Sequence, residues 1–175
     1  MEPEGIEGRQ GSAPVDLLPS GRFSGREAFE TLVRDALACA AREGWPEIIL
    51  SDATFLDWPL RERAVAESLQ AWSKTGRQIT ILASRYDEVI RHHARFVTWR
   101  TTWGHIINSR VCRVRAPADF PSAIWSPGWA LHRFDPVRSV GVCGQDRERR
   151  VELKEALTEL LRNSSPGFAS TTLGL

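Results

Sequence analysis

Arginine, histidine and tryptophan side chains gather between residues 91 and 105, the most distinctive stretch of the chain. On a helix these residues fall into two adjacent stripes. The stripes are Arg91, Arg95 and Thr98 in one, and His92, Phe96, Trp99 and Trp103 in the other. Guanidinium groups bind phosphate or carboxylate through paired hydrogen bonds, and aromatic rings stack on nucleobases. The pattern therefore predicts a surface for an anion or for single-stranded nucleic acid.

The distribution of charge favours the same stretch. Residues 89–118 carry six arginines, no lysine and no acid, whereas residues 1–88 carry ten basic and fifteen acidic side chains. Such asymmetry is typical of a surface that meets a charged partner. The candidate anion-binding residues are Arg91, Arg95, Arg100, Arg113 and Arg115. A second interpretation stays open, in which the aromatic rings pack onto the core and the acidic first half of the chain neutralises the arginines.

A second aromatic cluster, Trp125-Ser126-Pro127-Gly128-Trp129, has the composition of a turn. Exposed aromatic residues at a turn often belong to a partner surface. The candidates for stacking or for a partner surface are His92, Trp99, Trp103, Trp125 and Trp129. The alternative is that both tryptophans of the turn cover the open end of the hydrophobic core.

Polar residues directly follow two predicted strands. Asp52 comes after the apolar run at residues 47–50, and Ser84 comes after the run at residues 79–83. In an open α/β sheet these positions lie at the carboxyl edge, where ligands usually bind. With Asp57 and Arg85 nearby, they form the candidate rim of a pocket. The alternative is that Ser84 only caps a helix and Asp52 only shapes a loop.

The motifs of common catalytic sites are missing from the sequence. Glycine-rich phosphate loops, dinucleotide fingerprints and the G-x-S-x-G elbow do not occur. The histidines lack convincing metal-ligand spacing, Cys39 and Cys112 lie at apolar positions, and Cys143 has no activating neighbour. We therefore expect no catalytic residue, no metal and no cofactor.

These observations predict a non-catalytic binding or interaction module with an arginine and aromatic surface, whose partner is an anionic ligand or a protein. One alternative is a phosphoester-directed enzyme that uses His92, His93 or His105 with arginine support. Another alternative is a nucleic-acid-binding protein. A histidine in a cleft, within hydrogen-bond reach of an acid or a nucleophile, would favour the enzyme.

Helices are predicted where apolar residues recur at helical spacing after a capping residue. They begin with capping boxes at Ser24 and Ser84 and with an Asp cap at Asp57, and a further helix covers residues 147–162. The first helix should end at Gly44. Apolar runs predict strands at residues 47–50 and 79–83, alternation predicts a strand at 110–115, and residues 130–134 and 139–143 should form an antiparallel pair.

Helices that alternate with short apolar strands predict an α/β fold, a three-layer domain with a mixed, mainly parallel sheet of four to six strands flanked by helices. This order of elements, over about residues 24–162, resembles one half of a phospholipase D-like fold. The family's catalytic motif, H-x-K-x4-D, is absent, because no histidine is followed two residues later by lysine. The resemblance therefore implies a copy without the family's nucleophile, and no family residue is carried over.

The chain of 175 residues is long enough for one well-packed domain. We expect an N-terminal arm at residues 1–20, a single α/β domain at 21–162 and a C-terminal tail at 163–175. The tail carries Phe168, Leu173 and Leu175, which we expect to dock on the domain, on a second copy in a homo-oligomer or on a partner. Because no apolar run could span a membrane and the first ten residues do not form a signal peptide, a cytoplasmic setting is expected.

Overall fold

A computed structural model of the chain describes residues 18–113 and 116–168. The helices are α1 (Arg26–Glu43), α2 (Arg63–Ser73), α3 (Asp87–His92), α4 (Ala94–Thr102) and α5 (Arg147–Arg162), with a short 3-10 helix at Pro117–Asp119. The strands are β1 (Gly21–Phe23), β2 (Glu47–Ser51), β3 (Gln78–Ala83), β4 (Ile107–Val111), β5 (Ser122–Trp125), β6 (Ala130–Asp135), β7 (Val140–Gly144) and β8 (Ser165–Pro166).

The described strands form one mixed sheet in the order β1-β7-β6-β5-β2-β3-β4-β8. This confirms the predicted α/β class with a mixed sheet. The expected dominance of parallel pairing is corrected, because only β2–β3 and β3–β4 are parallel and the other five pairs are antiparallel. Helical crossovers separate the parallel strands, whereas short turns join β5, β6 and β7 and so force antiparallel pairing.

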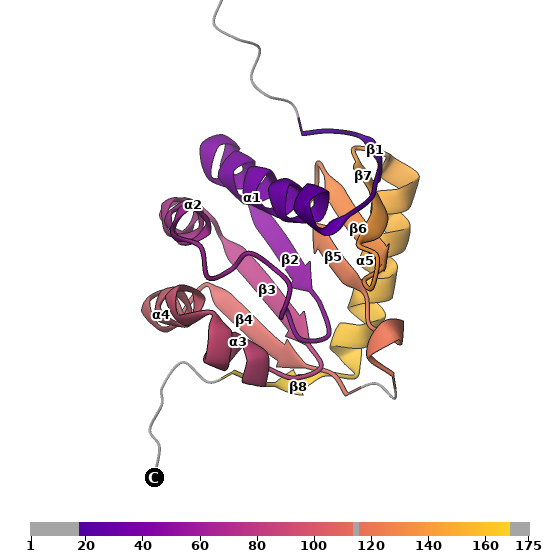
Figure 1. Cartoon of the computed structure of the whole chain (residues 1–175). Helices are drawn as coiled ribbons and strands as arrows, with labels where there is room; N and C mark the ends of the chain where they lie inside the picture. The colour runs from indigo at the N-terminus through magenta and orange to yellow at the C-terminus, as the bar shows by residue number, and fades with distance from the viewer. Residues whose placement is uncertain (1–17, 114–115, 169–175) are drawn as a thin grey trace, which may run out of the picture.

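Helices cover both faces of the sheet and complete three layers (Figure 1). Helices α1 to α4 pack on one face, over a core that includes Phe29, Leu50 and Ile81. Helix α5 packs alone on the other face, where Leu153 and Leu157 meet Ile49 and other residues of the central strands. The lone helix cannot cover eight strands, which leaves part of its face of the sheet open.

Helix α1 begins and ends near the predicted residues but not through the predicted capping box. Its first turn has Gly25 as the N-cap with no side-chain hydrogen bond, and the Gly25 amide instead donates to the Ser139 carbonyl at 3.1 Å. A contact with the β6–β7 hairpin thus replaces the local cap expected at Ser24. At the other end, Gly44 adopts a left-handed conformation with φ 67°, as expected for a helix-ending glycine.

The other two helix starts differ from the prediction. Helix α2 begins at Arg63 rather than Asp57, because Asp57 turns toward β6 in the loop after β2. Ser84 does not cap the next helix, whose N-cap is Tyr86 with no side-chain hydrogen bond. The predicted third helix is divided into α3 and α4 at His93, which has φ −120° and ψ 58°.

The C-terminal half matches the prediction in two elements and departs from it in one. The β6–β7 pair and helix α5 lie where they were expected. Strand β4 spans Ile107–Val111 rather than residues 110–115, and residues 114 and 115 lie outside the described residues. The expected N-terminal arm is described only from residue 18 onward. Within the described ranges, none of the helices combines the length and hydropathy needed to cross a bilayer.

Candidate functional site

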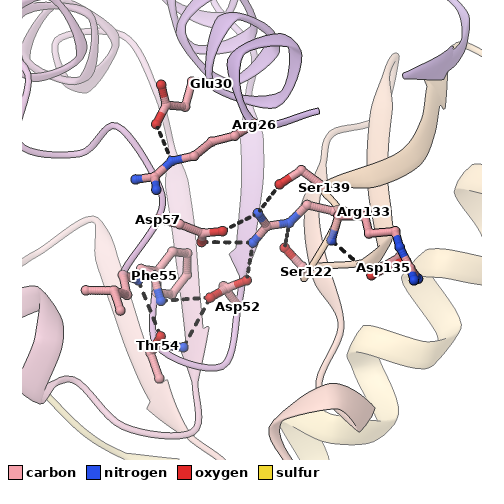
Figure 2. Close-up of polar contacts among 12 residues, drawn as sticks. Arg26, Glu30, Asp52, Thr54, Phe55, Asp57, Ser122, Arg133, Asp135 and Ser139 are labelled. Atoms are coloured by element: carbon pink, nitrogen blue, oxygen red, sulfur yellow. Dashed lines mark hydrogen bonds and ion pairs between the residues drawn. The ribbon is translucent and has the colours of Figure 1, made fainter. Parts of the chain in front are cut away.

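A buried arginine organises the polar cluster at the carboxyl ends of β2 and β6 (Figure 2). The Arg133 side chain is only 1% exposed and donates from Nη1 and Nη2 to both carboxylate oxygens of Asp57, at 2.6 and 3.0 Å. Nη2 also donates to Oδ1 of Asp52 at 3.2 Å. Nε and Nη1 donate to the hydroxyls of Ser122 and Ser139, at 3.0 and 3.3 Å. These contacts leave the guanidinium enclosed.

The strand pattern explains why these residues meet. Alternation along β6 directs Leu131 and Arg133 to the face covered by α1, where the guanidinium carbon lies 3.9 Å from the centre of the Phe29 ring. Strand β5 pairs antiparallel with both β2 and β6, so β2 and β6 run in the same direction. Asp52, directly after β2, therefore lies at the same sheet edge as the end of β6.

The cluster functions chemically as a closed ion-pair centre. Oδ2 of Asp52 accepts from the amides of Thr54 and Phe55, at 3.1 and 2.8 Å, so both carboxylate oxygens of Asp52 have partners. Asp57 is the more open member, with its side chain 31% exposed. Charge-assisted hydrogen bonds of this kind are strong, and they hold the loop after β2 against the β6–β7 hairpin.

The predicted pocket rim is only partly assembled. Asp52 and Asp57 meet, but on Arg133 rather than around an open pocket. The backbone amides of Ser84 and Arg85 both donate to the Ala53 carbonyl, at 3.0 and 3.3 Å, which places these residues beside the same loop. Arg133 was not predicted as a site residue. The one feature of the sequence that could have indicated it is that a basic residue stands within the predicted strand at residues 130–134.

The predicted arginine surface is divided by the fold. Arg91 and Arg95 are exposed on α3 and α4, whereas Arg100 is buried. Nε of Arg100 donates to the Ser109 hydroxyl at 2.8 Å, its Nη1 has no partner among the described residues, and burial lowers the pKa of the guanidinium. Burial therefore removes Arg100 from any solvent-facing patch. Arg113 is exposed beyond β4, and Arg115 lies outside the described residues.

Most of the predicted stacking residues belong to the core. Trp99, Trp125 and Trp129 are each less than 10% exposed. Their indole nitrogens donate to the Ser73 hydroxyl, the Arg150 carbonyl and the Pro19 carbonyl respectively. These three rings are corrected from surface candidates to packing residues. Trp103 is partly buried, with its indole nitrogen 2.8 Å from Oε1 of Gln70, and His92 is exposed.

The three histidines of the enzyme hypothesis do not share a site. His92 pairs with Glu88 at 3.1 Å on the exposed turn of α3. His93 is buried, with Nε2 2.7 Å from the Phe55 carbonyl, and burial lowers the pKa of its imidazole. His105 is exposed and lies against the Trp103 ring, with 5.9 Å between ring centres.

Among the residues that the structure describes, the cysteines and the acidic side chains do not form a reactive cluster. Burial raises the pKa of Cys39 to about 11, and burial also raises the pKa of Cys143. These thiols are therefore protonated at neutral pH and weakly nucleophilic. In the parts of the chain that the structure describes, no group of three His, Cys, Asp or Glu side chains is arranged to hold a metal ion.

An open groove of about 510 Å³ lies between α2 and α4. Its polar lining consists of Arg63, Glu67, Gln70, Lys74, Arg95, Thr98 and Thr102. Arg63 pairs with Glu67 at 2.8 Å, whereas Nη1 of Arg95 donates to the Arg61 carbonyl at 2.9 Å and has no acidic partner among the described residues. The groove thus carries three cationic groups and one carboxylate.

Comparisons with known proteins show the fold and not a family. The chain matches no protein-family model and no curated protein. It is structurally similar to TrmBL2, an archaeal chromatin protein, with a TM-score of 0.61 and 11% identity over 91% of this chain. It is also similar to Nuc, a phospholipase D family member from Salmonella typhimurium, with a TM-score of 0.55 and 10% identity, covering 83% of this chain and 97% of Nuc. The chain spans 57% of the length of TrmBL2.

The similarity to Nuc confirms the resemblance to a phospholipase D-like fold that the order of elements predicted. At these identities the likeness concerns the fold alone.

Proposed function

We propose that this chain is a non-catalytic binding module of phospholipase D-like fold that holds the phosphates of a nucleic acid in the groove between α2 and α4. The observation that carries the proposal is the pair Lys74 and Arg95, which line the groove from its two helices. Neither side chain has an acidic partner among the described residues, so each is available to a phosphate. Backbone phosphates are the main source of affinity in such complexes.

Neighbouring groups suit the same ligand. Gln70 and Thr98 line the groove with polar groups beside the cations. Arg61 is exposed just before α2, and Arg91 is exposed on α3, where its Nη1 lies 3.9 Å from Oε1 of Glu88. TrmBL2 is described as a chromatin protein with a novel mode of DNA binding, which supports nucleic acid as the class of ligand to test first.

The non-catalytic part of the proposal is supported by the closed cluster around Arg133. A guanidinium that is 1% exposed and bound to two carboxylates is not available to stabilise a phosphoester during reaction. The competing enzyme hypothesis has one supporting contact, between His92 and Glu88. That pair lies on a helix surface with the imidazole side chain 46% exposed, whereas a general acid or base works in a site that positions the substrate.

Binding to labelled single-stranded DNA and RNA, and to duplex DNA, should be measured by fluorescence anisotropy at several salt concentrations. The double variant Lys74→Ala/Arg95→Ala should weaken binding and reduce the slope of log K against log salt by about 1 to 2. The matched control is Arg147→Ala/Arg162→Ala, which removes two exposed arginines from α5 on the opposite face of the sheet. Absence of binding at low salt, or equal losses in the two double variants, would refute the proposal.

A further inference from the structure

A cavity of about 420 Å³ lies on the other face of the sheet, between the β6–β7 hairpin and α5. Its floor consists of Ala130, His132, Val142 and Gly144, and its wall on α5 includes Arg149, Leu153 and Ala156. Volumes of roughly 300–1,000 Å³ are typical of sites for small organic ligands. No residue of this cavity belongs to the groove between α2 and α4.

The cavity results from an asymmetry between the two flanks of α5. On the β5 flank, the Trp125 indole fills the space, donating to the Arg150 carbonyl at 3.0 Å and lying 4.0 Å from Nζ of Lys154. On the flank of the β6–β7 hairpin, several lining positions are small, with Ala130 on β6, Gly144 on β7 and Ala156 on α5. The space beside α5 on this second flank is therefore left as a cavity.

His132 supplies a hydrogen-bonding group inside this apolar space. Register places His132 opposite Val142 on β7, and both side chains line the cavity. Neither ring nitrogen of His132 has a hydrogen-bond partner among the described residues. Burial lowers the pKa of the imidazole, so the neutral ring offers one donor and one acceptor near neutral pH.

The rim of the cavity carries two guanidinium groups that can bind an anionic group. Arg150 donates to the carbonyls of Gln145 and Pro127, which leaves its positive charge without an acidic partner among the described residues. Arg149 is exposed and lines the cavity one position earlier on α5. Two acids also line it. Oδ1 of Asp146 accepts from the Arg149 amide at 2.8 Å as the helix cap, and Glu152 is exposed on α5.

We propose that this cavity binds a small aromatic monocarboxylate. The ring would lie on Val142 and Leu153, whose apolar surfaces it removes from water. The carboxylate would accept a hydrogen bond from the His132 imidazole and from the Arg149 guanidinium, both of which line the cavity. This site is independent of the nucleic-acid groove.

The test uses 2-naphthoate as the probe and 2-naphthamide as its uncharged analogue, titrated into the ¹⁵N-labelled full chain and followed by amide chemical shifts. We expect 2-naphthoate to shift amides of β6, β7 and the first half of α5, and to bind at least about tenfold more tightly than the amide. Ala156→Trp, which fills the cavity, and Arg149→Gln, which removes the donor, should each weaken binding at least about tenfold. Arg147→Gln, on the same helix but not in the lining, is the matched control and should bind as the native chain does.

Shifts outside these elements, equal binding of the two probes, or unaltered binding to Ala156→Trp would overturn the proposal. Because a tryptophan at this position could disturb α5, each variant is first compared with the native chain by circular dichroism, and Ala156→Leu provides a smaller filling side chain with the same expected direction. DNA binding by the native chain is also measured with and without 2-naphthoate. Because the cavity and the groove share no residue, binding of either ligand should not depend on the other. Failure of one proposal therefore leaves the other proposal standing.

Discussion

Arg133 and Asp57 form a two-pronged ion pair, with Nη1 2.6 Å from Oδ2 and Nη2 3.0 Å from Oδ1, although 76 positions separate them in sequence. The pair joins the end of β6 to the loop after β2, on either side of the intervening strand β5. The Phe29 ring of α1 packs against the same guanidinium. One side chain therefore ties a helix, a loop and a hairpin together at the carboxyl edge of the sheet.

Replacing this arginine should destabilise the protein strongly. Arg133→Leu leaves the carboxylate of Asp52 buried without its cationic partner, and breaking a buried pair in this way costs about 3–5 kcal/mol of unfolding free energy. Urea denaturation followed by tryptophan fluorescence would measure the loss. A cost below about 1 kcal/mol would contradict the structural role assigned to the cluster.

The companion variant Asp52→Asn/Asp57→Asn/Arg133→Leu removes all three charges together. It should lose less free energy than the sum of the separate substitutions, because no charge is left buried without a partner. Simple additivity would show that the three groups do not act as one unit.

The parts of the fold that are predictable from sequence are those with a local signal. Residues 47–50 and 79–83 are apolar runs, and α5 has a regular stripe of leucines, so their structure follows from short-range pattern. Strands β1 and β8 were missed because they hold three and two residues and exist only through pairing with β7 and β4. Strand β5 was missed because all four of its residues are buried, which removes the alternation that marks a half-exposed strand.

Tertiary contacts also override local signals within helices. Apolar spacing continues through residues 89–97, yet the helix divides at His93, where the imidazole contacts the Phe55 carbonyl 38 positions away. Ser24 has the sequence of a capping box, but the neighbouring Gly25 amide bonds to Ser139 instead. A single sequence does not disclose such distant partners.

The candidate site was predictable to a similar extent. Asp52 and Asp57 were predicted from their position after a strand, whereas their shared partner, Arg133, becomes evident only when β6 is placed beside β5. Arg100 is buried because its side of α4 packs toward β4, where it contacts Ser109. Helical spacing places Arg91 and Arg95 on one side of a helix, but it does not show which side of the helix faces the sheet. Pattern identifies chemistry-bearing residues, and packing decides which of them reach solvent.

Trp99 should contribute to stability rather than to base stacking. Trp99→Phe keeps an aromatic ring beside Phe96 but removes the donor to the Ser73 hydroxyl, and it should cost about 1 kcal/mol. Trp99→Ala opens a cavity and should cost about 3–5 kcal/mol. Both losses are measurable by urea denaturation.

If the groove between α2 and α4 binds nucleic acid as proposed, folded Trp99→Phe should bind with native affinity, because Trp99 lines the groove but is only 3% exposed. Trp103→Phe, which alters a partly buried ring of the same segment, is the matched comparison. A selective loss of binding in Trp99→Phe would show that the indole reaches the ligand.

Stability should fall as the pH drops below the ordinary histidine pKa of about 6.5. Burial lowers the pKa of His93 in the folded state, so the unfolded chain binds this proton more readily and acidification favours unfolding. His93→Gln should flatten the decline of unfolding free energy between pH 7 and pH 5, by at most about 1.4 kcal/mol per pH unit for one proton. Urea denaturation at several pH values would measure the slope.

His132→Gln is the necessary comparison for this pH dependence, because burial lowers the pKa of His132 in the same direction. Each single variant should flatten the curve and the double variant should flatten it further. An identical slope in His93→Gln and the native chain would mean that His93 is protonated as easily when folded as when unfolded.

The start of the C-terminal segment should stabilise the fold through Phe168. Its ring stacks on Tyr86, with 4.9 Å between ring centres and 14° between planes, and it lies 5.8 Å from the guanidinium carbon of Arg100. The Gly167 amide donates to the Ser109 carbonyl, and Pro166 pairs with Arg110 in the sheet. The predicted docking residues Leu173 and Leu175 lie outside the described residues, so the structure supports the docking prediction through Phe168.

Phe168→Ala should lower the melting temperature by about 2–8 °C, since a loss of about 1–2 kcal/mol shifts Tm by roughly 2–4 °C per kcal/mol in a chain of this size. Deleting residues 166–175 should lower it further, because the backbone contacts to β4 are lost as well. Val137→Ala, at a position 94% exposed in the β6–β7 turn, is the control and should leave Tm unchanged. If the deleted chain melted at the native temperature and kept the native oligomeric state, the stacking of Phe168 on Tyr86 would contribute nothing to stability.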